Sequence, residues 1–201
     1  MRRIVAIDHL SLDGVMQAPG RPDEDRRGGF EHGGWAAANT DPVMMETLGK
    51  GMAQAASLLF GRRTYEDFFT VWPGRTDNPF TEVLDHSQKY VASRTLREPL
   101  PWQNSTLLAG EAAETVARLK AEPGEDLTVL GSGGLMQTLI RHGLVDRYVL
   151  LVHPLLLGRG RRLFGDEAPP TPLRLVDSVT TTRGVVIATY EPEADRERGS
   201  R

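Results

Sequence analysis

The segments GRRTYE at residues 61–66 and GSGG at residues 131–134 decide how this chain is expected to fold. Each follows a short apolar run, at 58–60 and 127–130, and each precedes a helix-like pattern. Unpaired N–H groups and the helix dipole favour phosphate at such a junction, and the first segment adds two arginines. Glycines in the second segment allow backbone to approach a pyrophosphate closely. Together the segments predict one nucleotide-binding site.

Strand-like and helix-like runs alternate over the first two-thirds of the chain, and strands dominate its end. This order favours a largely parallel sheet that antiparallel strands complete. The first run, residues 3–10, is almost continuously apolar, as expected for a strand covered on both faces. Further strands are predicted at 58–60, 89–93, 106–108, 127–130, 145–152, 173–179 and 184–190, and helices at 42–56, 63–69, 111–120 and 133–142.

A long irregular stretch rich in glycine and proline follows the first strand, at residues 13–39. Loops of this length inside a domain are usually functional lids or disordered segments, and aromatic residues such as Trp35 favour the lid. The pair Asp41-Pro42 then predicts a helix start, because aspartate is a good N-cap and proline suits the first helical position.

Length, charge and composition limit the classes of protein that this chain can belong to. The 201 residues suit a single domain, which we place at 1–192, and the charged segment 193–201 is expected to be a disordered tail. The net charge of −3, with both signs interspersed, argues against a nucleic-acid or membrane surface. The absence of cysteine excludes disulfides and cysteine-bound metals, and no metal site is expected. No apolar run reaches the roughly 20 residues of a membrane span, and the absence of a signal peptide predicts a cytoplasmic location.

Several motifs together resemble the dihydrofolate-reductase-like family, and more closely its branch that includes the reductase domain of bacterial riboflavin biosynthesis. The resemblance extends from Arg3 to Glu191. It implies a three-layer α/β fold, in which helices flank a central mixed sheet of about eight strands and NADPH lies across the strand ends. The motifs are SLDG at 11–14, the segments 61–66 and 131–134, and PLLLGRG at 154–160 followed by Leu163-Phe164.

The resemblance implies a set of cofactor-binding residues. The arginines and threonine of 61–66 would hold phosphates, especially the 2′-phosphate, because a guanidinium suits that dianion. The glycines of 131–134 would hold the pyrophosphate, with a cis peptide expected between Gly133 and Gly134. Taken alone, the two arginines could equally be a solvated helix start, and 131–134 a tight turn. The implied set is Gly61, Arg62, Arg63, Thr64, Ser93, Arg94, Gly131, Ser132, Gly133, Gly134, Leu135 and Met136.

Asp13 is the predicted acid of the site. It follows the first strand, where the chain passes over the expected nicotinamide, and partial burial there would raise the pKa of its carboxyl toward the range for proton transfer. The alternative is that Asp13 belongs only to a turn. Glu46 is the second candidate, because dihydrofolate reductases carry their acidic residue on the corresponding helix. We assign Val15 and Trp35 to substrate binding.

The chemistry implied by the resemblance is transfer of a hydride from NADPH to a C=N or C=O bond of a small, heterocyclic substrate. Two alternatives remain: a non-catalytic NADPH-binding sensor or regulatory protein, and a riboflavin-pathway reductase that acts on 5-amino-6-(5-phosphoribosylamino)uracil. A small molecule is the expected partner, and relatives of this kind are commonly homodimers.

Overall fold

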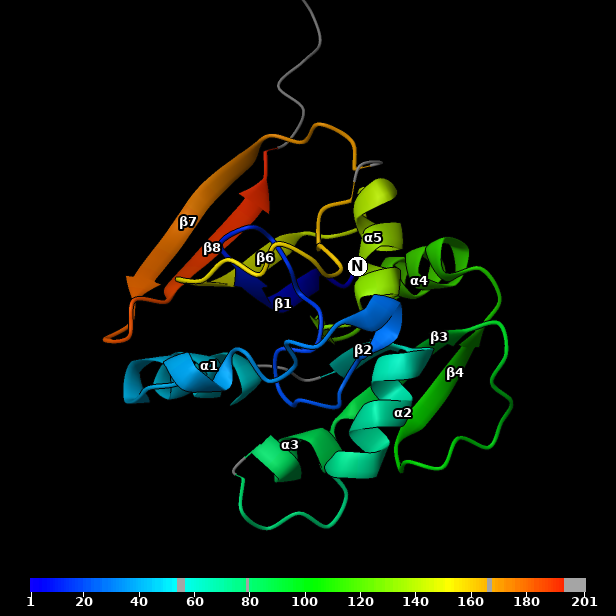
Figure 1. Cartoon of the computed structure of the whole chain (residues 1–201). Coiled ribbons are helices and arrows are strands. Elements are labelled where there is room, and N and C mark those ends of the chain that lie inside the picture. The colour runs from blue at the N-terminus through cyan, green and yellow to red at the C-terminus, as the bar shows by residue number, and fades with distance from the viewer. Residues whose placement is uncertain (54–56, 79, 166–167, 194–201) are drawn as a thin grey trace, which may run out of the picture.

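A computed structural model describes residues 1–53, 57–78, 80–165 and 168–193 of the chain (Figure 1). Short 3-10 turns at Arg27–Gly29 and Ala37–Asn39 lie within the loop that follows the first strand. The strands are β1 (Ile4–Ser11), β2 (Ser57–Gly61), β3 (Gln88–Ser93), β4 (Ser105–Ala109), β5 (Leu127–Leu130), β6 (Arg147–His153), β7 (Leu173–Thr180) and β8 (Val186–Pro192). The α-helices are α1 (Pro42–Ala53), α2 (Arg62–Val71), α3 (Phe80–His86), α4 (Ala112–Ala121) and α5 (Gly133–Arg141).

The strands form one mixed sheet in the order β4-β3-β2-β5-β1-β6-β8-β7. Neighbours from β4 to β6 in this order run parallel, whereas β8 pairs antiparallel with β6, and β7 with β8. α4 and α5 lie on one side of the sheet and α1 to α3 on the other (Figure 1). The expected three-layer α/β fold, with an eight-stranded mixed sheet flanked by helices, is therefore confirmed.

The alternation of side chains along the strands builds a core on each face. In β2, Leu59 packs with the cluster beneath α4 and α5, while Leu58 and Phe60 pack with α2 and α3. In β1, the even-numbered Ala6 faces the first of these clusters, and Ile7 packs against α1. Successive strand residues point to opposite faces, so apolar runs rather than strict alternation are what a sheet covered on both sides requires.

Element boundaries differ from the predicted ones where the sequence signal is local and weak. α1 ends at Ala53, and the predicted continuation through 54–56 lies outside the described residues, as do 194–201 of the expected tail. Sequence reasoning missed α3, which starts where the Asn78 side chain accepts a hydrogen bond from the Phe80 N–H (2.9 Å) and which buries Leu84. An asparagine cap before a helix of only about two turns is easily taken for a loop.

Asp41 joins α1 to the turn between β7 and β8. Its Oδ1 accepts the N–H of Met44 (2.8 Å), which confirms the predicted cap. Its Oδ2 accepts the Thr182 hydroxyl (2.6 Å) and the N–H of Arg183 (3.0 Å). These donors, the Thr182 hydroxyl foremost, lower the pKa of the Asp41 carboxyl to about 2. Asp41 and Thr182 are 141 residues apart in the chain, so one carboxylate holds together two segments that are distant in the sequence.

We expect Asp41 to make stability depend on pH in acid. Because the folded pKa is depressed below its ordinary value of 3.8, the contribution of Asp41 is complete above that value and is lost as pH falls toward about 2. Urea unfolding midpoints across this range should therefore fall more steeply in wild type than in Asp41→Asn, which should already be less stable at neutral pH. Parallel curves for the two proteins would contradict this account.

Candidate nucleotide and substrate site

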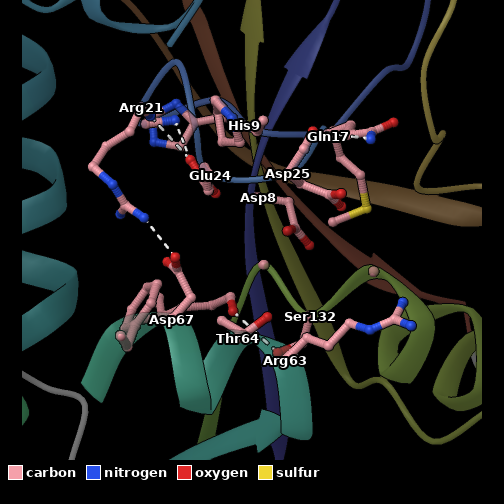
Figure 2. A pocket seen from close by; sticks show the side chains of 18 of the residues that line it. Asp8, His9, Gln17, Arg21, Glu24, Asp25, Arg63, Thr64, Asp67 and Ser132 are labelled. Atoms are coloured by element: carbon pink, nitrogen blue, oxygen red, sulfur yellow. Dashed lines mark hydrogen bonds and ion pairs between the residues drawn. The ribbon is translucent and has the colours of Figure 1, made fainter. Parts of the chain in front are cut away.

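A cavity of about 680 Å³ opens at the carboxyl ends of the central strands (Figure 2). Its lining comes from β1, from the loop after β1, from α1 to α3, and from the turns at 130–133 and 161–162. In an open α/β sheet, this edge is where ligands bind. Arginine is prominent in the lining, which suits an anionic ligand: Arg21, Arg26, Arg27, Arg63, Arg75, Arg161 and Arg162.

One hydrogen bond brings the two diagnostic segments together. The backbone N–H of Gly61 donates to Ser132 Oγ (3.1 Å), so the start of α2 lies beside the start of α5. Neither helix has a side-chain cap, which leaves N–H groups of both first turns available at the cavity. Ser132 (φ 59) and Gly131 (φ 58) hold left-handed conformations that shape this turn. Two helix N-termini and nearby arginines are the elements that bind a pyrophosphate.

Five of the predicted cofactor residues line the cavity. Arg63 extends from the start of α2, and no ion-pair or hydrogen-bond partner of its guanidinium is found in the described part of the chain. Figure 2 shows Arg63, Thr64 and Ser132 on the same wall, opposite the loop that follows β1. The five residues are Arg63, Thr64, Gly131, Ser132 and Gly133.

The other predicted cofactor residues lie outside the cavity lining. Arg62 forms an ion pair with Glu66 on the outer side of α2 (3.0 Å). The Ser93 hydroxyl accepts two backbone N–H groups of its own turn, and the exposed Arg94 pairs with Glu111 (3.1 Å). Gly61 supports the corner through its backbone. Gly134 follows in α5, and Leu135 and Met136 are buried in the core beneath that helix.

The peptide bond between Gly133 and Gly134 is trans, so the expected cis bond is wrong. Among the described residues, the cis peptide is Glu98–Pro99. Gly133 is nevertheless constrained, because a Cβ atom there would come within 3.0 Å of Met16 Sδ. Close contact with the loop after β1, rather than a strained peptide, explains a glycine at this position.

Asp13 does not have the environment predicted for an acid. Its carboxylate accepts the Ser11 hydroxyl (2.7 Å) and the N–H groups of Leu157 (3.1 Å) and Gly158 (2.8 Å). These donors, first the Ser11 hydroxyl and then the Leu157 N–H, lower the pKa of Asp13 to about 2, so the expected rise is wrong. Asp13 is outside the cavity lining. It joins the 11–14 turn to the 154–160 loop, which is a structural role.

Glu46 and the two predicted substrate residues also lie away from the cavity lining. Glu46 is exposed on α1 and pairs with Lys50 (2.7 Å), whereas the lining takes Leu48 from the same helix. Val15 and Trp35 belong to the loop after β1 and are buried together in its own apolar cluster. Trp35 Nε1 donates to the backbone carbonyl of Gln17 (2.8 Å), so both residues support the cavity wall from behind.

Sequence reasoning missed Asp8, which lines the cavity from β1. Its side chain is 2% exposed and its Oδ2 has no hydrogen-bond partner. Burial raises the pKa of Asp8 well above its ordinary value, against the smaller effect of the Gly131 N–H. A single carboxylate within the apolar run IVAIDHL was the available signal, because such a residue must be neutral or paired if the run is a buried strand.

His9, which follows Asp8, also lines the cavity. Its Nδ1 lies 2.9 Å from Nε2 of His153 on β6. Burial, and then the neighbouring imidazole, lower the pKa of His9 to about 3, and burial lowers that of His153 to about 4. Both rings are neutral at physiological pH, and Trp35 packs edge-on against His153.

The loop after β1 is held over the cavity by specific polar contacts. Arg21 forms an ion pair with Asp67 on α2, which bridges the two walls in Figure 2. The Gln17 side chain donates to the carbonyls of Asp25 (3.2 Å) and Arg27 (3.0 Å) and accepts the Arg161 N–H (3.0 Å).

In the described part of the chain, no helix is long and apolar enough to cross a bilayer. The same residues include no group of three or more His, Cys, Asp or Glu side chains that could hold a metal ion.

The fold and the cavity define an α/β protein of the dihydrofolate-reductase-like class. Residues 4–187 match the family described as the RibD C-terminal domain, so the chain belongs to this reductase-type family. The chain is 31% identical to the uncharacterized protein YyaP of Bacillus subtilis (strain 168) over 195 residues, which cover 94% of each sequence.

Solved structures show the same fold. A putative riboflavin biosynthesis protein from Shewanella sp. PV-4 superimposes with a TM-score of 0.73 at 22% identity, over 96% of this chain and 99% of that one. Dihydrofolate reductase from Enterococcus faecalis, solved in complex with NADP(H), gives a TM-score of 0.58 at 14% identity, over 96% of this chain and 97% of that one. The similarity to these two proteins is one of fold.

We expect the Gly61–Ser132 hydrogen bond to contribute measurably to stability. Ser132→Ala should lower the free energy of unfolding by about 1 kcal/mol, because the Gly61 N–H loses its acceptor. Ser105→Ala is the matched control, since the buried Ser105 hydroxyl has no partner and its removal should cost little. Chemical denaturation measures both. Equal losses in the two variants would contradict the role of this bond.

Proposed function

We propose that this protein is an NADPH-dependent reductase that transfers a hydride to a C=N or C=O bond of a small heterocycle. The observation that carries the proposal is one continuous cavity, which extends from the uncapped N-termini of α2 and α5 to the buried end of β1. A phosphate-binding end and a sheltered apolar end within one cavity suit a dinucleotide whose reactive ring must be kept from water.

The residues present fit this cofactor. Arg63 and Thr64, with the N–H groups of α2, would hold the 2′-phosphate. Gly131 and Ser132 form an open turn for the pyrophosphate, because no atom lies within 4 Å of the position that a Cβ on Gly131 would take. Apolar side chains such as Met16 and Leu130 would enclose the ring. When bound, the cofactor would supply the hydride, and the protein would orient it and exclude water.

The likeness to named proteins supports the same proposal. The family takes its name from the C-terminal domain of RibD, and the Enterococcus faecalis reductase is described with NADP(H) bound. The riboflavin-pathway reductase remains a narrower form of the proposal. The second candidate is an NADPH-binding sensor, and oxidation of bound NADPH by any acceptor in a broad panel would favour the enzyme over it.

Homodimer formation and a cytoplasmic location belong to the same proposal. Exposed apolar side chains on the edge strand β7 and its neighbour β8 support a dimer: Leu175 is 51% exposed and Val176 41% on β7, and Val186 is 39% exposed on β8. A sheet edge that carries apolar residues is commonly covered by another chain.

Calorimetric titration with NADPH and NADH tests the proposed cofactor. NADPH should bind at least about tenfold more tightly, which corresponds to about 1.4 kcal/mol. Arg63→Ala should weaken NADPH by about 1–3 kcal/mol and NADH much less, because a charged hydrogen bond to the 2′-phosphate is lost. Arg62→Ala is the matched control, since Glu66 already holds its guanidinium and it lies outside the lining.

Two results would overturn this assignment. If neither cofactor binds, the resemblance extends to the fold alone and the reductase proposal fails. If Arg62→Ala and Arg63→Ala weaken NADPH equally, Arg63 has no special place at the 2′-phosphate.

A further inference from the structure

Strand β1 extends beyond its pairing with β5. The two strands pair only as far as Ile7 and Leu130, whereas β1 continues to pair with β6 as far as Ser11 and His153. β5 stops because the chain turns at Gly131 into α5. At Asp8 and His9, one edge of β1 therefore faces the cavity instead of another strand. Figure 2 shows the Asp8 side chain in the middle of this opening, between the loop after β1 and the Ser132 turn.

Asp8 is a buried carboxyl without a full set of partners. It lies on the face of β1 that Ala6 and Leu10 direct toward α5, and it is 2% exposed. A buried carboxylate that lacks partners costs several kcal/mol or takes up a proton. Burial accordingly raises the pKa of Asp8 well above its ordinary value, which favours the protonated form of the carboxyl.

The other acidic groups around the cavity are already engaged. Asp67 pairs with Arg21, Asp25 pairs with Arg27, and the Glu24 carboxylate accepts the Gly20 and Arg21 N–H groups. In the described part of the chain, no cationic side chain forms an ion pair with Asp8. The remaining charged or titratable groups of the lining are His9, which is neutral, and Arg26, Arg63, Arg75, Arg161 and Arg162.

The order of the strands places Asp8 beside the ring end of the proposed cofactor site. β5 lies between β2 and β1, and the phosphate-binding turns follow β2 and β5. From these turns the cavity continues to the open edge of β1. This step rests on the proposed function. A nicotinamide there is neutral when reduced and cationic when oxidised, and a neighbouring cation favours the ionised form of a carboxyl.

We propose that Asp8 holds the proton that the reduction consumes, and that its ionisation is coupled to the charge of the bound nicotinamide. The acceptor carbon gains the hydride of NADPH with both electrons, the O–H bond of Asp8 breaks, and its proton goes to the acceptor nitrogen or oxygen. The carboxylate left behind balances the positive charge of NADP⁺, and water returns the proton after release. The substrate class is accordingly a neutral imine or carbonyl compound.

The test compares NADP⁺ with NADPH over a range of pH, with the full chain. Dissociation constants are measured by calorimetry between about pH 6 and about pH 9, which brackets neutral conditions. The affinity of NADP⁺ relative to NADPH should rise with pH, by up to about tenfold per pH unit, because NADP⁺ selects ionised Asp8. Both cofactors carry the same 2′-phosphate, so its own titration cancels in the ratio.

Two variants locate the linkage. Asp8→Asn cannot ionise, so the ratio of the two affinities should no longer depend on pH. Asp13→Asn is the matched control from the same segment, because the carboxyl of Asp13 is ionised throughout and its pKa of about 2 lies far from the range tested. If Asp8→Asn does not fold, wild type alone suffices: NADP⁺ binding at about pH 7 should release up to one proton, and NADPH binding none.

The possible failures are distinguishable. A constant ratio in wild type, or equal proton release with both cofactors, overturns the role of Asp8 and leaves the cofactor site intact. If rising pH weakens the binding of both cofactors equally, ionised Asp8 acts on the phosphates that they share and not on the nicotinamide, which also overturns the inference. If the ratio of the two affinities still depends on pH in Asp8→Asn, another group titrates, and the inference is again overturned. Absence of any binding overturns the proposed function itself.

Discussion

The early end of β5 is the constraint on which the site depends. β5 has four residues, Leu127–Leu130, and pairs with β2 on one side and β1 on the other. Because it turns at Gly131 while β1 continues, the start of α5 comes beside the start of α2, and the Gly61–Ser132 hydrogen bond holds the two together. The same early end leaves the edge of β1 open. The two turns proposed to bind phosphate and the buried carboxyl thus have one geometrical cause.

Buried polar groups in this protein are of two kinds. Lys89 is fully buried, but its ammonium donates to the carbonyls of Leu84 (2.7 Å), Asp85 (3.1 Å) and Ser87 (2.8 Å) and lies 4.6 Å from the centre of the Trp102 ring. All of its donors are satisfied, so it stabilises the end of α3. Asp8 leaves an oxygen without a partner. Unsatisfied buried groups are rare and costly, and a ligand that completes them offsets the cost.

Much of the site was predictable because its signals are local. A strand end, a glycine-rich or arginine-rich turn and a helix start are contiguous in the sequence, so 61–66 and 131–134 could be placed at one edge of a parallel sheet. Arg63 and Arg62 could not be told apart in this way, since their difference is the ion pair of Arg62 with Glu66. The assignment of Ser93 and Arg94 to the cofactor site came from the family resemblance, and both residues lie outside the cavity lining.

The sequence by itself determined the family, the order of most strands and helices along the chain and the position of the two turns proposed to bind phosphate, because periodicity and turn chemistry are properties of short segments. Only the tertiary structure decided which carboxyl has a raised pKa and which has a lowered one. The pKa of Asp13 is lowered by the Ser11 hydroxyl and then by the N–H groups of Leu157 and Gly158, which are more than 140 residues away. The Asp8 carboxyl lacks a full set of hydrogen-bond donors, because β5 ends beside it, and its Oδ2 has no partner. A pKa depends on what surrounds the group in space, and residues distant in the sequence supply those surroundings.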